Sequence, residues 1–145
     1  MEPLSVGIHS VANIGALKPS ESVVVFGAGP VGLLCMAVAR ALGASRVVAV
    51  DIVPSRLEFA KAYAATDVYL PPAPQEGEAR AAYSARNARA MMDALGIAER
   101  GPTAIDLVVE ASGAEVSIQT GILIAKHGGS FVQVRLRPLL RAIVV

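Results

Sequence analysis

The clearest chemical pattern in this sequence is a run of glycines that directly follows a short apolar segment. Gly27, Gly29 and Gly32 fit the spacing G-x-G-x-x-G, and Pro30 stands where a helix would begin. Between a strand and a helix, the first glycine allows a tight turn and the second lets the backbone approach a pyrophosphate. The third allows the helix to pack closely on the strand, and the helix amides then face the phosphates. The segment therefore predicts a dinucleotide-binding turn.

A carboxylate stands at the position that such a turn requires. Asp51 closes the second apolar segment, 19 residues after Gly32, where it can accept hydrogen bonds from an adenosine ribose. The same carboxylate would repel a 2′-phosphate, and the adjacent Ile52 offers no cation to receive one. Arg56 could meet such a phosphate, but a guanidinium there can equally stack on adenine or remain solvated. The pattern favours NAD over NADP.

Alternating strands and helices must position these residues. Five short apolar segments without strict alternation are typical of strands buried on both faces: 23–26, 47–50, 68–70, 105–109 and 131–134. Helices are expected from Pro30 to about Leu42, from about Pro54, over 78–95, and over 115–126, where Gly128 and Gly129 are expected to end the last one. Arginines 80, 86, 89 and 100 are expected on a solvated helix face. This alternation predicts an α/β fold with a doubly wound parallel sheet of the Rossmann type.

A second segment is expected at the same sheet edge. Ser112 follows Glu110 and Ala111 at the end of the fourth apolar segment. Ligands of open α/β sheets bind at the carboxyl ends of the strands, so a backbone or hydroxyl contact from Ser112 to the cofactor is expected.

The composition excludes several classes of function. Apolar residues make up 54% of the 145 residues, and the net charge of +1 gives no case for nucleic acid or an anionic membrane as partner. Cys35, His9 and His127 cannot supply a zinc site, so no metal site is expected, and Cys35 is interpreted as a core thiol. Without a membrane-length apolar run or a visible signal peptide, we expect a soluble, cytoplasmic protein.

Taken together, these segments resemble the cofactor-binding half of medium-chain, zinc-type alcohol dehydrogenases. Within that superfamily they look like the NAD-dependent polyol branch of sorbitol and xylitol dehydrogenases. The resemblance extends from Glu2 to about Val134 and rests on residues 2–9, 25–32, 51–60, 69–101 and 110–115. It implies that residues 1–134 form an NAD-binding domain. The implied reaction transfers hydride between a secondary alcohol of a polyol and NAD, giving a ketose, with zinc as the Lewis acid.

The resemblance also implies roles for individual residues. Glu2 matches a catalytic position near the zinc. The cofactor contacts carried over are Gly27, Gly29, Pro30, Val31 and Gly32 for the pyrophosphate, Asp51, Ile52 and Arg56 for the adenosine, and Ala111 and Ser112 at the edge of the fourth strand.

The chain departs from the family in two places. The family's zinc is held by an N-terminal catalytic domain that we expect this chain to lack, so this chain alone is expected to contain no zinc and to be inactive. Residues 135–145 form a divergent apolar and basic tail in place of a sixth strand, which predicts self-association through an open sheet edge. A fragment, a misread gene model and a natural truncation all remain open.

Other classes of function are weighed against this interpretation. A freestanding NAD sensor would bind NAD tightly without a partner. A methyltransferase also combines a glycine loop with an acidic residue after the second strand, but the Gly29 to Gly32 spacing opposes it. A short-chain reductase is disfavoured because no tyrosine has a lysine four residues later.

Overall fold

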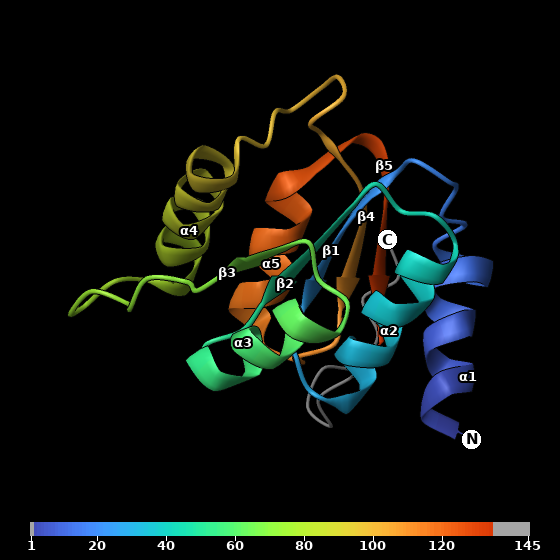
Figure 1. Cartoon of the computed structure of the whole chain (residues 1–145). Helices are drawn as coiled ribbons and strands as arrows, with labels where there is room; N and C mark the ends of the chain where they lie inside the picture. Colours follow the sequence, from blue (N-terminus) through green and yellow to red (C-terminus); the bar gives the residue numbers. More distant parts are fainter. Residues whose placement is uncertain (1, 135–145) are drawn as a thin grey trace.

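The computed structural model describes residues 2–134, in which strands alternate with helices (Figure 1). The strands are β1 (Ser22–Phe26), β2 (Arg46–Val50), β3 (Asp67–Tyr69), β4 (Ile105–Glu110) and β5 (Ala125–Gln133). The helices are α1 (Glu2–Ile8), the π-helical segment η1 (His9–Ile14), α2 (Pro30–Ala41), α3 (Pro54–Tyr63), α4 (Arg80–Leu95) and α5 (Glu115–Ile124). None of these helices is long and apolar enough to cross a bilayer. The predicted tail, residues 135–145, lies outside the described residues.

The strands form one parallel sheet in the order β3-β2-β1-β4-β5. The central strand β1 pairs with both of its neighbours up to its last residue, where Phe26 lies between Val50 of β2 and Glu110 of β4. The carboxyl ends of these three strands therefore coincide. As a result, the loops that follow them, which begin at Gly27, Asp51 and Ala111, meet at one edge of the sheet.

Helices cover both faces of the sheet, as expected for a doubly wound fold (Figure 1). Successive side chains of a strand point to opposite faces, so β1 contributes to two separate cores. Val25 packs in a cluster that includes Met36 of α2, whereas Val24 packs in a second cluster that includes Met91 of α4. Both faces are apolar for this reason, and the predicted α/β class and parallel sheet are confirmed.

The two ends of the described chain differ from the prediction. No helix is predicted before the first strand, but α1 and η1 form because α1 packs on α2. Gly7 makes this contact close: a Cβ atom there would lie 3.3 Å from the Leu34 carbonyl carbon. The helix predicted over 115–126 ends at Ile124, and β5 begins at Ala125, before the glycines that were expected to end the helix. Its pairing with β4 is irregular near its start, which accommodates these glycines.

Candidate functional site

A groove runs along the carboxyl edge of the sheet and consists of two adjoining cavities. The first, about 330 Å³, lies over the ends of β1, β2 and β4, and its lining includes Gly27, Gly29, Asp51, Ile52, Arg56, Ala111 and Ser112. The second, about 360 Å³, is lined by Val6, Gly29, Pro30, Val31, Gly32, Ala111 and Val134. Both cavities are lined by Gly29 and Ala111, so they adjoin each other at these two residues. The structure therefore brings all ten predicted cofactor residues together along this groove.

The three glycines of the turn are required for different reasons. Gly27 has a φ of +93°, and a Cβ atom there would lie 2.9 Å from the amide nitrogen of Ser112. At Gly32, a Cβ atom would lie 1.8 Å from the carbonyl oxygen of Gly27, which is far inside contact distance. At Gly29, by contrast, a Cβ atom would meet nothing within 4 Å. Gly27 and Gly32 thus serve the fold, whereas Gly29 leaves open space along the groove.

The start of α2 provides donors toward this space. Pro30 is at the first position of the helix, Gly29 caps it without a side chain, and the first turn carries no acidic residue. The amides of Val31 and Gly32 belong to the first turn and have no acceptor four residues earlier within the helix. Donors and the positive end of the helix dipole together suit an anionic group such as a pyrophosphate.

Asp51 connects the adjacent strand end to the glycine turn. Its side chain is buried, Oδ2 accepts the Ala28 amide at 2.8 Å, and Oδ1 accepts the Val53 amide at 2.9 Å. Nη1 of Arg56 lies 3.8 Å from Oδ2. A carboxylate oxygen has more than one acceptor site, so Asp51 can hold the turn and still accept hydrogen bonds from a ribose.

Glu110 is a residue of this region to which the sequence analysis gives no role. Its side chain is fully buried at the end of β4, and Oε1 accepts the amides of Ser112 and Gly113 at 2.8 and 2.9 Å. The Ser112 hydroxyl also donates to Oε1, so it is directed to Glu110. The signal that could reveal this role is an acidic residue directly after a buried strand and before a Ser-Gly turn.

Other residues with potential chemistry lie away from the groove or fit a structural role. Burial raises the pKa of the Cys35 thiol to about 11, so this cysteine is a core thiol as expected. His9 shares a hydrogen bond with Asn13 in η1, and His127 is exposed in β5. Glu2 begins α1, but its side chain is not among the described ones. Residues 2–134 contain no group of three His, Cys, Asp or Glu side chains able to hold a metal.

A third cavity, about 600 Å³, adjoins the Asp51 end of the groove, because Ile52, Pro71 and Val116 line both. The proline-rich loop, residues 71–77, forms one wall, and Tyr83 of α4 forms another. Most of its lining residues lie in 69–101, one of the segments on which the resemblance to the polyol branch rests.

The chain belongs to the zinc-binding dehydrogenase family, because residues 30–139 match the model of that family. Among curated proteins, it is 51% identical to a probable D-xylulose reductase A of Aspergillus terreus over 133 residues, which are 92% of this chain and 34% of that protein. The D-xylulose reductase A of Aspergillus oryzae is 50% identical over the same shares. The chain thus spans about a third of the length of these relatives.

A solved structure shows the same architecture. The benzyl alcohol dehydrogenase of Acinetobacter calcoaceticus superposes with a TM-score of 0.74 at 26% identity, over 97% of this chain and 34% of that one. These matches confirm the predicted resemblance to zinc-type alcohol dehydrogenases and, through the D-xylulose reductases, to their polyol branch.

Proposed function

We propose that this chain binds NAD as the cofactor-binding domain of a polyol dehydrogenase. In that enzyme, hydride passes between a xylitol-like or sorbitol-like secondary alcohol and NAD, giving a ketose. The observation that carries the proposal is the pair of adjoining cavities along the sheet edge, one lined by Asp51 and the other by the first turn of α2, with open space at Gly29 between them. The identity to D-xylulose reductases supports the substrate class.

The two halves of the groove suit the two halves of a dinucleotide. Asp51 lines only the cavity of about 330 Å³, together with Ile52 and Arg56. If Asp51 accepts hydrogen bonds from the adenosine ribose, this cavity takes the adenosine, and the cavity lined by Val31 takes the nicotinamide half. The pyrophosphate then crosses at Gly29, where the two cavities meet.

Each element of this chain has a binding or orienting role in the proposal. The first-turn amides of α2 neutralise the pyrophosphate, and Asp51 selects a ribose with a free 2′-hydroxyl because its charge repels a 2′-phosphate. The backbone at Ala111 borders both cavities and limits how the dinucleotide crosses the sheet edge. When bound, the nicotinamide supplies the hydride acceptor.

Zinc does not fit the residues described here. The whole sequence has one Cys and two His, and the described residues gather no set of three His, Cys, Asp or Glu side chains able to hold a metal. We therefore derive no step through zinc, and we expect this chain alone to contain no stoichiometric zinc and to leave NAD unreduced with xylitol or sorbitol. Metal analysis that finds one tightly held zinc per chain, with polyol-dependent NADH absorbance, would overturn this expectation.

Direct binding tests the proposal. Isothermal calorimetry of the purified chain should detect NAD, and NADP should bind more weakly because of Asp51. S-adenosylmethionine is the matched comparison, since a methyltransferase would prefer it. Preference for S-adenosylmethionine, or no heat with NAD at millimolar concentration, would contradict the proposal, whereas very tight NAD binding without a partner would favour the sensor alternative.

Finer expectations belong to the same proposal. We propose that the protein is cytoplasmic and that NAD is its ligand. A polyol or ketose binds only when a catalytic domain is also present, and neither nucleic acid nor a membrane is a partner. The near-neutral net charge of +1 supports the absence of a nucleic-acid partner. Self-association through the edge at β5 depends on residues 135–145, which lie outside the described residues.

A further inference from the structure

Two loops, each followed by a helix, face the groove, and their backbone amides are used differently. After β1, the first-turn amides of α2 remain available to a ligand, as described above. After β4, the loop to α5 satisfies its amides internally: Ser112 and Gly113 donate to Glu110, and Ala114 donates to Oγ of Ser112 at 3.1 Å. The carboxylate of Glu110 thus accepts the amides of the β4–α5 loop to which an external anion could otherwise bind.

The carboxylate of Glu110 reaches back into the loop that follows it. Gly113 donates to both oxygens, at 2.9 Å to Oε1 and 3.1 Å to Oε2, and adopts a φ of +73°. Glu110 is fully buried, and hydrogen bonds to a buried charged group are stronger than those between neutral groups. This one side chain therefore holds the backbone at Ser112 and Gly113.

The same loop lies in direct contact with the glycine turn. The Ala111 amide donates to the Phe26 carbonyl at 2.8 Å, and a Cβ atom on Gly27 would lie 3.0 Å from the carbonyl carbon of Ala111. Ala111 also borders both cavities of the groove. A shift of this loop would change the width of the groove at the point where the pyrophosphate is proposed to cross.

We infer that Glu110 is a positioning residue for the dinucleotide. It occupies the amides of the β4–α5 loop, holds Ala111 and Ser112 against Gly27, and leaves the β1–α2 turn as the anion-binding loop. This inference rests on the proposed function, since it concerns how NAD is held. Glu110 itself touches no cofactor in this arrangement and acts through the backbone of the loop.

Glu110→Gln tests the inference, because it keeps the size of the side chain and an acceptor oxygen at the Oε1 position, but removes the carboxylate charge and places an NH₂ group where Oε2 faces the Gly113 amide. The loop amides that donate to the Glu110 carboxylate would then form weaker hydrogen bonds. This change should raise the Kd for NAD by roughly tenfold or more. The measurement is calorimetry with NAD and with adenosine, at a temperature where unfolding curves show the variant to be folded. The Kd for adenosine, which has no phosphate, should change much less.

Thr120→Val is the matched control for destabilisation alone. Thr120 is also fully buried and hydrogen-bonded, but it lies in α5 and does not line the groove. This variant should lower the unfolding midpoint and leave the Kd for NAD unchanged. An unchanged Kd for NAD in folded Glu110→Gln would overturn the inference, whereas a wild-type chain that binds no NAD would instead overturn the proposed function.

Ser112→Ala keeps the inference testable if Glu110→Gln does not fold. It removes the hydroxyl that connects Glu110 to Ala114 and should raise the Kd for NAD by about threefold, the effect of one neutral hydrogen bond. An unchanged Kd would contradict the inference. Where both single variants fold, the double variant should bind NAD with the same Kd as Glu110→Gln, since the two residues act together. If the two increases in Kd instead multiply in the double variant, Ser112 contacts NAD directly.

Discussion

The groove edge and the layer between α4 and α5 use polar groups in opposite ways. At the groove, Gly29 faces open space, and the first-turn amides of α2 lack acceptors within their helix. Between α4 and α5, polar side chains pair with one another: Tyr69 donates to Asn87 at 3.1 Å, and Asn87 donates to Thr120 at 3.3 Å. Unused hydrogen-bonding capacity marks a surface built for a ligand, whereas satisfied capacity marks a surface built for stability.

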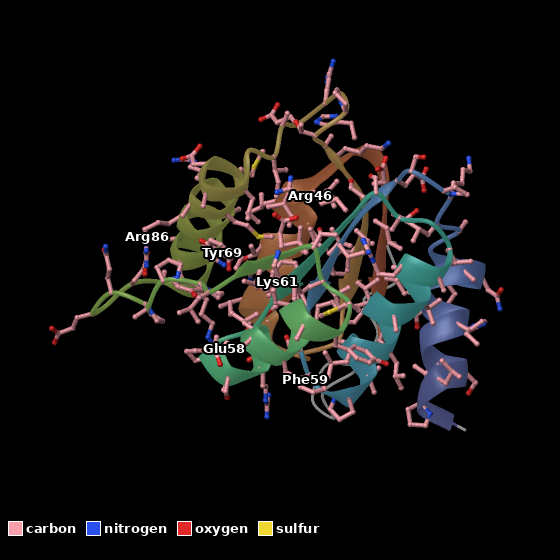
Figure 2. The ribbon with its side chains drawn as sticks, viewed as in Figure 1. Arg46, Glu58, Phe59, Lys61, Tyr69 and Arg86 are labelled. Atoms are coloured by element: carbon pink, nitrogen blue, oxygen red, sulfur yellow. The ribbon has the colours of Figure 1, made fainter. Side chains whose placement is uncertain are left out.

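Figure 2 shows Tyr69 and Arg86 on the α4 side of the sheet. Arg86 makes two 2.8 Å hydrogen bonds to the carboxylate of Glu78 and lies over the ring of Tyr83. Changes in the groove should therefore alter NAD binding more than stability, and changes in the α4 layer should do the reverse.

Gly32→Ala should have the largest effect and should affect both properties. The added methyl group would lie 1.8 Å from a backbone oxygen, so the β1–α2 turn must shift. We expect a loss of roughly 3 kcal/mol in the free energy of unfolding, at the upper end for overpacking, together with loss of NAD binding. Urea unfolding and calorimetry measure the two quantities.

Gly29→Ala is the matched variant, with the same chemical change three residues earlier. Its methyl group would meet no protein atom within 4 Å, and the backbone angles at Gly29, φ −79° and ψ −177°, suit alanine. Stability should stay within about 1 kcal/mol while NAD binding weakens at least roughly tenfold, because the methyl group enters the pyrophosphate space. Equal NAD binding by Gly29→Ala and wild type would show that the groove is not the binding site.

Asp51→Ser should have the next largest effect and tests a groove residue that has both a structural role and a proposed binding role. Asp51 both holds the Ala28 amide and faces the groove. Loss of the proposed hydrogen bonds to the ribose should weaken NAD binding by roughly 1–3 kcal/mol, and loss of the charge should reduce discrimination against NADP. Calorimetry with both dinucleotides checks this, and an unchanged NAD affinity would contradict the assignment.

Local signals explain why the glycine turn, Asp51 and the parallel sheet could be predicted from the sequence. Each depends on residue type and on spacing within one βαβ unit. The start of β5 could not be predicted in this way. Gly128 and Gly129 were interpreted as the end of a helix, but pairing with β4 draws the chain into a strand from Ala125. That pairing connects segments about 20 residues apart, and no local pattern encodes it.

For the arginines of α4, the sequence predicted exposure to solvent but not the individual partners of each side chain. Arg80 and Arg86 were expected on a solvated helix face, and Arg80, with a side chain 74% exposed, does lie there beside Glu115. Arg86 instead reaches back to Glu78, which lies before α4, because the proline-rich loop folds against the helix. Arg100 is not on the helix face where it was expected, because α4 ends at Leu95.

Tyr69→Phe should have a smaller effect, confined to stability. The hydroxyl of Tyr69 is buried with Asn87, so its removal leaves the Asn87 oxygen without this donor. We expect a loss of about 1 kcal/mol in the free energy of unfolding and an unchanged Kd for NAD. Urea unfolding and calorimetry provide the measurements. A weakened NAD affinity would mean that the groove and the layer between α4 and α5 are coupled and do not serve separate purposes.

The smallest effect should appear in the pH dependence of stability. Hydrogen bonds from Arg86, and then from the Gln75 amide, lower the pKa of Glu78 from 4.5 to about 2. A carboxylate with a lower pKa in the folded state stabilises the fold above its unfolded pKa, and this contribution disappears as the pH falls from about 4.5 to 2. The Arg86 side chain is one-third exposed to solvent, so the effect should be modest and should weaken further in high salt.

Glu78→Gln isolates this contribution. The variant should lose part of the acid-induced decrease in stability between pH 4.5 and 2, measured by urea unfolding at several pH values. Arg86→Gln should flatten the same interval, since the pKa of Glu78 returns toward its ordinary value without the guanidinium. NAD binding at neutral pH should be unaffected by either variant, because Glu78 lines only the third cavity and Arg86 none of the cavities described above. A pH profile identical to that of the wild type in both variants would show that the Glu78–Arg86 pair contributes nothing to stability.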